Sequence, residues 1–362
     1  MKERRKRNMS GTGLLFLFCL LMLCGCAQIT GFMENTEVSG REVESLAAEK
    51  EDDTVLLGGM PVGIYMETDG VLVLDTEKMT GMDGKEYTPA QGVVSSGDYI
   101  TEVNHQKIEG KKQLMDLVEH LDGEKVLLTV RRENTILEKK LTPVQISKGN
   151  YRLGIWVRDN VQGLGTITFL TKNNRFAALG HGIHDVDTST LLTIKRGTLY
   201  RTSIQKVQKG SKGNPGTMEG IIVYNRFHQL GVIEKNTDAG IYGELNSDRS
   251  WIGEEVPIQV AKKEEIKTGE ARIRCYIDGE VKEYTICITQ IDKESDQVNK
   301  GMVIQVTDTE LLEKTGGIIQ GMSGSPIIQN GKLIGAVTHV FVQDSTKGYG
   351  IFIENMLKEE ES

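Results

Sequence analysis

The segment Gly321-Met322-Ser323-Gly324-Ser325-Pro326-Ile327-Ile328 places one serine between two glycines, directly before an apolar strand. Glycine on both sides of Ser323 allows a tight turn that exposes the hydroxyl. A serine alcohol is a poor nucleophile until a base removes its proton, and the tetrahedral intermediate then needs donors for its oxyanion. The backbone N–H groups of Gly321 and Ser323 can point at one such site. The segment therefore predicts a nucleophile together with its oxyanion hole.

A second glycine-flanked segment, Ala178-Leu179-Gly180-His181-Gly182-Ile183-His184-Asp185-Val186-Asp187-Thr188, offers a base. His181 follows an apolar run and lies between two glycines, so its imidazole can reach a cleft from a tight turn. A single histidine is otherwise most often a satisfied structural residue. The order of His181 before Ser323, which is also the order in chymotrypsin-like enzymes, favours the role of general base.

A carboxylate should orient the imidazole of His181 and balance the charge that it gains. Asp308 is the first choice for this acid. Asp185 and Asp187 are alternatives that lie close to the histidine in the sequence. A Ser-Lys dyad that uses Lys332 is a further alternative.

His339 lies on the strand expected after the nucleophile. In chymotrypsin-type enzymes this strand lines the substrate pocket. A histidine there could favour an acidic or amide side chain before the scissile bond. The alternative is a buried strand residue with a local hydrogen bond.

The composition indicates a mainly β protein. The chain has 362 residues, of which 38% are apolar and 26% charged, and this excludes a polytopic membrane protein, a collagen-like fibre and a wholly disordered chain. Glycine is frequent (41) and proline scarce (6), as in strand-and-turn proteins. The net charge of -8 argues against nucleic acid as a partner. Short apolar runs between turns over residues 147–362 predict a β-barrel or sandwich.

The amino terminus is typical of an export signal. A basic cluster precedes the apolar run Leu14–Cys24, which is too short for a comfortable transmembrane helix. Cys26 follows in a context that resembles a lipoprotein cleavage site, so residues 1–26 form either a lipid-anchored or a differently processed signal. The polar, acidic residues 27–53 are interpreted as a tether. Everything after the signal should lie outside the cytoplasm.

Only two cysteines, Cys275 and Cys287, follow the signal. The segment 272–288 predicts a hairpin with Asp278-Gly279 at its turn. That register pairs Cys275 with Lys282, so it does not support a cross-strand disulfide. No Cys/His spacing indicates zinc, and we expect neither a metal nor another cofactor.

Residues 54–146 form a smaller predicted unit with strand-like runs and one helix, Lys111–Leu121. Its stretch Ser96-Gly97-Asp98-Tyr99-Ile100-Thr101-Glu102-Val103-Asn104 resembles the corresponding part of PDZ domains, which are small α+β domains. Such domains bind an extended peptide beside a strand edge and capture its terminal carboxylate. The matching loop would be Gly58–Gly63, in which Gly59, Val62 and Gly63 are the candidate peptide-binding residues. A PDZ domain that only packs against its neighbour is the alternative.

The segments around His181 and Ser323, behind a PDZ domain and an export signal, resemble the stage IV sporulation protein B serine peptidase family from about residue 54 to the end. The resemblance implies a chymotrypsin-like, β-barrel-type peptidase domain over residues 147–362. It also implies a catalytic triad of His181, Asp308 and Ser323. Met322 stands where chymotrypsin-like enzymes usually have Asp, so zymogen activation through a new amino terminus is not expected.

The same resemblance implies the biology. Family members act in the space between forespore and mother cell, where they cut themselves and the extracytoplasmic part of an inhibitory membrane protein. This cut activates an intramembrane metalloprotease that processes a late sigma factor. The expected partners are therefore that membrane protein and peptide termini bound by the PDZ domain. The competing hypothesis is a non-catalytic PDZ adaptor with a degenerate peptidase domain.

Overall fold

The structure is a computed structural model that describes residues 54–362. The predicted signal (1–26) and acidic tether (27–53) lie outside the described residues. Strands dominate the described part, which confirms the mainly β class predicted from the sequence. Within residues 54–362, no helix is both long and apolar enough to cross a bilayer.

The first half of the peptidase core is an antiparallel sheet that carries the histidine segment. Alternate residues face inward, as Val62, Ile64 and Met66 do on one strand, and they bury an apolar interior. The strands of this half are β1 (Thr54–Leu57), β2 (Pro61–Thr76), β11 (Ile155–Leu170), β12 (Arg175–Ala178), β13 (Ile194–Tyr200), β16 (Gln229–Thr237) and β17 (Gly240–Leu245). A separate hairpin is formed by β14 (Thr202–Gln208) and β15 (Thr217–Ile222).

The second half of the peptidase core carries the nucleophile segment and encloses another apolar cluster. The predicted hairpin is confirmed: Cys275 pairs with Lys282, the turn residues Asp278 and Gly279 have φ of 54° and 93°, and Cys275 and Cys287 are free thiols. Its elements are β18 (Pro257–Val260), η1 (Lys263–Glu265), β19 (Gly269–Ile277), β20 (Glu280–Ile291), β21 (Met302–Val306), α3 (Thr309–Thr315), β22 (Pro326–Gln329), β23 (Lys332–Phe341), β24 (Asp344–Phe352) and α4 (Ile353–Glu361).

The PDZ-like part has a core of its own. Its predicted helix is present as α2 (Lys111–Glu119), with Leu114 buried against the strands. The remaining elements are β3 (Met79–Thr80), β4 (Glu86–Tyr87), β5 (Tyr99–Val103), β6 (Gln106–Lys107), β7 (Val126–Arg132), β8 (Thr135–Leu141), β9 (Val144–Ser147) and β10 (Asn150–Arg152).

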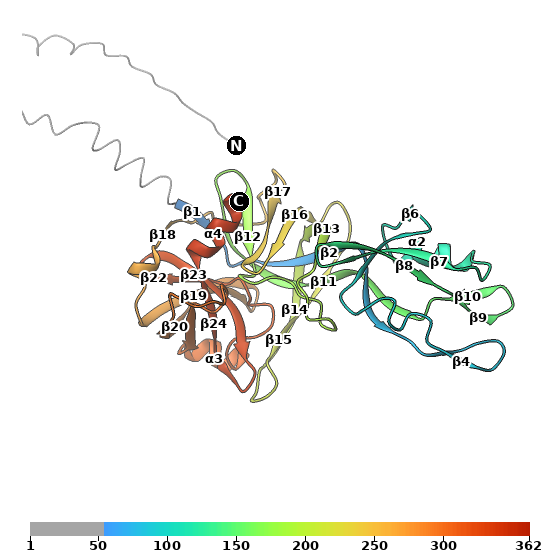
Figure 1. Ribbon diagram of the computed structural model, residues 1–362. Helices are drawn as coiled ribbons and strands as arrows, with labels where there is room; N and C mark the ends of the chain where they lie inside the picture. The colour runs from blue at the N-terminus through green and yellow to red at the C-terminus, as the bar shows by residue number, and fades with distance from the viewer. Residues whose placement is uncertain (1–53) are drawn as a thin grey trace, which may run out of the picture. The chain divides into compact units, whose positions relative to one another are not determined.

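Two long strands, β2 and β11, contribute to both cores and pair with each other along most of their length (Figure 1). On β2, Val62 packs in the peptidase core and Val73 in the PDZ core. On β11, Val157 packs against the PDZ core and Ile167 in the peptidase core. The expected domain boundaries therefore need correction, because residues 54–66 belong to the peptidase core and the PDZ core extends to residue 157.

The expected PDZ carboxylate loop, Gly58–Gly63 with Gly59, Val62 and Gly63, is also corrected. The N–H groups of Gly58 and Gly59 donate to the carbonyls of Thr168 and Ile167 at 2.9 and 2.7 Å. Val62 is fully buried in the peptidase core. Pairing with β11 therefore incorporates this loop into the peptidase sheet. Because the N–H groups of Gly58 and Gly59 are hydrogen-bonded within that sheet, they cannot bind the carboxylate of a peptide terminus.

Candidate active site

The nucleophile segment forms a tight turn before β22. The Ser325 N–H donates to the Met322 carbonyl at 2.9 Å, which closes the turn around Ser323. Gly324 has φ of 93°, and a Cβ added there would lie 2.1 Å from the Thr166 carbonyl oxygen. Glycine is therefore required at this position for both backbone conformation and space.

Strand β11 holds this turn in place. The Thr166 N–H donates to the Ser323 carbonyl at 3.0 Å, and the Thr166 hydroxyl donates to the Gly321 carbonyl at 2.9 Å. The Thr168 hydroxyl donates to the Gly324 carbonyl at 2.8 Å. Both threonines are buried, so these bonds are protected from competing water. The nucleophile turn is thereby fixed against the sheet that carries the histidine segment.

The two amides expected to form the oxyanion hole are available. Among residues 54–362, the N–H groups of Gly321 and Ser323 have no hydrogen-bond acceptor. Both residues line the same cavity. Backbone donors that are left unpaired beside a serine hydroxyl can stabilise the oxyanion of a tetrahedral intermediate.

His181 follows β12 through an unusual turn. Leu179 and Gly180 both have positive φ, 71° and 68°, which turns the chain sharply after the strand. The Leu179 N–H donates to the Thr166 carbonyl at 3.2 Å, so the same residue of β11 supports both turns. The Nδ1 of His181 lies 2.8 Å from the Gly182 carbonyl oxygen. An Nδ1–H donated to this carbonyl leaves Nε2 as the proton acceptor.

A cavity of about 360 Å³ brings His181 and Ser323 together, with His339 beside them. In the present arrangement the Ser323 hydroxyl donates to the Thr338 carbonyl at 2.7 Å. Among the described residues no hydrogen bond joins the Ser323 hydroxyl to the His181 imidazole, so the hydroxyl must turn away from Thr338 before His181 can take its proton. Apo serine hydrolases often have loose nucleophile–base geometry that tightens only with substrate.

The two histidine rings pack against each other, with centroids 4.6 Å apart and planes inclined by 35°. Burial lowers the pKa of His181 below its ordinary value of 6.5, and the nearby His184 lowers it further. The pKa of His339 is lowered to about 4, first by its desolvation at the cavity wall and then by the positive charges that His181 and Lys300 can carry. Both rings are therefore neutral at pH 7, and His181 is ready to accept a proton.

Asp308 does not lie with the other two members of the expected triad. Its carboxylate caps α3: one oxygen accepts from the Leu311 N–H at 3.1 Å and the other from the Thr285 N–H at 3.2 Å. Within the described part of the chain it makes no contact with His181. The stretch Thr307-Asp308-Thr309 is a helix start, and its N-cap role accounts for the aspartate.

The two alternative acids, Asp185 and Asp187, also have other partners than His181. Arg158 on β11 forms ion pairs with both Asp185 and Asp187, and Asp185 is buried. Asp185 also accepts from the Thr188 N–H at 2.9 Å, which shapes the turn behind the histidine. The hydrogen bonds and the guanidinium outweigh burial, so the pKa of Asp185 is lowered. Lys332, the alternative base, pairs with Glu265 and does not line the cavity.

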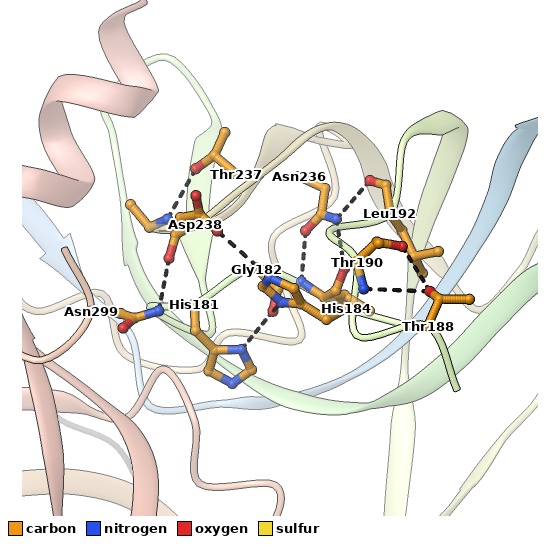
Figure 2. A network of polar contacts seen from close by, with 12 residues as sticks. His181, Gly182, His184, Thr188, Thr190, Leu192, Asn236, Thr237, Asp238 and Asn299 are labelled. Atoms are coloured by element: carbon orange, nitrogen blue, oxygen red, sulfur yellow. Dashed lines mark hydrogen bonds and ion pairs between the residues drawn. The ribbon is translucent and has the colours of Figure 1, made fainter. Parts of the chain in front are cut away.

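Three residues that surround the two turns were not predicted from the sequence. Thr166 supports both turns, and the Thr338 carbonyl accepts a hydrogen bond from the Ser323 hydroxyl. Asp238 lies 3.6 Å from the Nε2 of His184 (Figure 2). Each lies at least 10 positions from the motif that it supports, and none belongs to a recognisable pattern. The alternation of β11 does predict that Thr166 and Thr168 share one face of a strand.

Comparison with known proteins gives one family and one curated relative. The profile of the SpoIVB peptidase S55 family matches residues 149–357. A protein of Helicobacter pylori strain J99, named "Putative zinc metalloprotease", is 28% identical over 180 residues, covering 43% of this chain and 50% of that protein. The chain thus spans about half the length of this relative.

Two solved structures are similar to parts of the chain. The PDZ domain of an SdrC-like protein from Listeria monocytogenes is 23% identical, with 25% of this chain and 87% of that chain covered and a TM-score of 0.21. The active form of the Rv3671c protease from M. tuberculosis is 15% identical, with 55% of this chain and 72% of that chain covered and a TM-score of 0.29.

Proposed function

Because this chain belongs to the SpoIVB peptidase S55 family and is a serine endopeptidase, we propose that it acts outside the cytoplasm during sporulation. Its substrates are itself and the extracytoplasmic part of a membrane regulator. Cleavage of the regulator activates an intramembrane protease that processes a late sigma factor. The family match and the export signal support this proposal, and the signal or a lipid on Cys26 keeps the enzyme at the membrane.

One observation carries the catalytic assignment: His181 and Ser323 line one cavity beside two unpaired backbone amides. The Ser323 oxygen attacks the peptide carbonyl carbon while the Nε2 of His181 takes the hydroxyl proton. The N–H groups of Gly321 and Ser323 bind the oxyanion. His181 then gives the proton to the leaving amine, and water hydrolyses the acyl-enzyme by the same route.

The cavity favours an apolar residue before the scissile bond. Within the described chain its wall contains no Asp, Glu, Lys or Arg. Its apolar members are Ile64, Val161, Leu164, Leu179, Ile183, Ile318, Ile319 and Val340. His339 is uncharged at pH 7 and does not attract a carboxylate, so the expected preference for an acidic side chain is not supported.

A fluorophosphonate probe tests the assignment on the purified full-length protein in detergent. We expect stoichiometric labelling that is lost in Ser323→Ala, together with loss of autocleavage and of cleavage of candidate membrane-protein ectodomains. Ser325→Ala is the matched control, because this buried serine lies two positions away and does not line the cavity. Absence of labelling in the wild type, with cleavage absent as well, would favour the non-catalytic adaptor.

A further inference from the structure

Strand β15 leads from the nucleophile turn to a surface outside the cavity. At its start, the Met218 N–H donates to the Gln320 carbonyl at 2.9 Å, and a Cβ added to Gly321 would lie 3.1 Å from the Met218 side chain. Two residues later, a Cβ added to Gly220 would lie 3.1 Å from the side chain of Leu164, which lines the cavity. The strand therefore follows the rim of the active site.

Three tyrosines form a cluster where the chain continues past β15. The Tyr224 ring packs edge-to-face on the rings of Tyr65 and Tyr200, with centroids 5.5 and 5.2 Å apart. Tyr65 and Tyr200 are half-buried, whereas Tyr224 is 47% exposed. The Tyr224 hydroxyl donates to the Oε1 of Gln162, which lines the cavity. Gln162 lies opposite Tyr65 in the sheet, so the cluster and the cavity wall are continuous on one face.

The cluster is held in place and offers ring surface to solvent. Asn225 fixes the following turn, because its Oδ1 accepts from the Phe227 and His228 N–H groups at 3.0 and 3.1 Å. Val223, next to Tyr224, is 43% exposed and adds to the apolar surface. Aromatic surface that is ordered before binding loses little conformational entropy when a partner docks on it.

The charged groups that act on Tyr65 have partners of their own. Glu67 and Arg196 form an ion pair at 2.7 Å, and Asp159 accepts from the Lys111 N–H at 2.8 Å. The cluster therefore favours an uncharged, apolar side chain over an acidic or basic one.

The length of β15 suits a peptide that leaves the cavity in an extended form. Met218 and Tyr224 are six positions apart, which corresponds to about 20 Å of extended chain. Val340 on β23 lines the cavity, and this strand is expected to bind the residue before the scissile bond. β15 begins instead beside Gly321, one of the proposed oxyanion donors, so it leads toward the residues that follow the scissile bond.

We propose that Tyr65, Tyr200 and Tyr224 bind an aromatic or other large apolar side chain of the substrate, within about six residues after the scissile bond. This inference rests on the proposed peptidase function and adds a second specificity site to it. The substrate is the favoured occupant because the cluster joins the active-site cavity through Gln162.

The wild-type enzyme tests this preference without any substitution. The full-length protein in detergent is incubated with peptides from a proteome digest, and mass spectrometry identifies the residues around each cut. The fastest-cut sequence is then synthesised with either Phe or Ser at each of the six positions after the cut. We expect kcat/KM to be about 3–10-fold higher for the Phe form at one or more of these positions beyond the first two.

Substitutions at Tyr224 then locate the binding surface. Tyr224→Ser removes the exposed ring and should bring the Phe-to-Ser ratio of kcat/KM close to one. Tyr224→Phe retains the ring and should retain the ratio. Trp156→Ser is the matched control, because Trp156 is an exposed aromatic residue on β11 that does not line the cavity; its ratio should equal that of the wild type.

Equal rates for the Phe and Ser peptides in the wild type would overturn the inference and leave the tyrosines to another occupant, such as a second copy of this chain or a lipid surface. A ratio that persists in folded Tyr224→Ser, or that is lost in Trp156→Ser, would overturn it as well. Peptides that remain uncut, together with a Ser323 that a fluorophosphonate does not label, would instead remove the peptidase assignment itself.

Discussion

The Thr166 hydroxyl donates a 2.9 Å hydrogen bond to the Gly321 carbonyl and so connects the sheet of the histidine to the turn of the nucleophile. The carbonyl of the same threonine accepts from the Leu179 N–H, just before His181. One residue thus sets the relative position of the two turns. Its side chain orients the peptide group next to one of the proposed oxyanion donors.

Thr166→Val should impair catalysis more than binding. The substitution keeps the shape but removes the hydrogen bond to the partly buried Gly321 carbonyl, which costs about 0.5–1.5 kcal/mol of stability. It also loosens the turn that presents Ser323, so we expect the rate of fluorophosphonate labelling to fall while the KM for a peptide changes little. Thr166→Ser retains the hydroxyl and should restore both quantities. Equal rates in the valine and serine variants would contradict this role.

Asp308→Ala should lower stability. The substitution removes the side chain that accepts from the Leu311 and Thr285 N–H groups, and losing such an N-cap costs roughly 0.5–2 kcal/mol. Urea unfolding of wild type, Asp308→Ala and Asp308→Asn measures this effect, and the asparagine variant should lie between the other two. An alanine variant as stable as wild type would show that the cap contributes nothing.

Activity should persist into mildly acidic solution. Because burial and His184 lower the pKa of His181, the base stays deprotonated below pH 6.5. The acid limb of kcat/KM should therefore fall below 6.5, which a pH series of peptide cleavage measures. An acid limb at or above 6.5 would contradict the lowered pKa.

The same shift affects folding. The unfolded chain binds the His181 proton more readily than the folded protein does, so stability rises with pH across this range. The free energy of unfolding should decrease as the pH falls through the unfolded-state value near 6.5. His181→Ala should reduce this dependence, as denaturation curves at several pH values would show; an unchanged slope would argue against the assignment.

The preference for the side chain before the scissile bond should change when a residue that lines the cavity is changed. Val340 lines the cavity, and Val340→Asp places a carboxylate there. We expect cleavage after apolar residues to drop at least about 10-fold, with cleavage after Lys or Arg rising relative to it. Val342→Asp is the control, because Val342 is exposed and lies outside the cavity wall. Identical peptide profiles for both variants would contradict the proposed pocket.

Local patterns predicted the elements that depend on near neighbours. The Asp278-Gly279 turn defined the hairpin and its register, and the apolar period of the PDZ helix located α2 to within two residues of its end. Glycine-flanked motifs also identified His181 and Ser323, because tight turns need glycine at fixed positions. These features require no knowledge of distant segments.

Features created by long-range pairing could not be predicted in this way. Residues 58–63 look like a free glycine loop, yet β11 recruits them into the peptidase sheet. Asp308 matches a catalytic position by resemblance, but its two amide contacts come from its own helix and from Thr285 on a neighbouring strand. Asp238 has no motif, since only the fold brings its turn to the histidine segment.

The two 16-residue strands β2 and β11 also determine how the protein can be divided. Any construction that excises the PDZ-like part must sever both strands, and each severed strand removes a partner from the peptidase sheet. The PDZ-like part therefore cannot be exchanged as a module at a flexible linker, as regulatory domains often are. Changes in ligand preference must instead arise by substitution within an intact scaffold, and heating should melt both cores in a single cooperative transition.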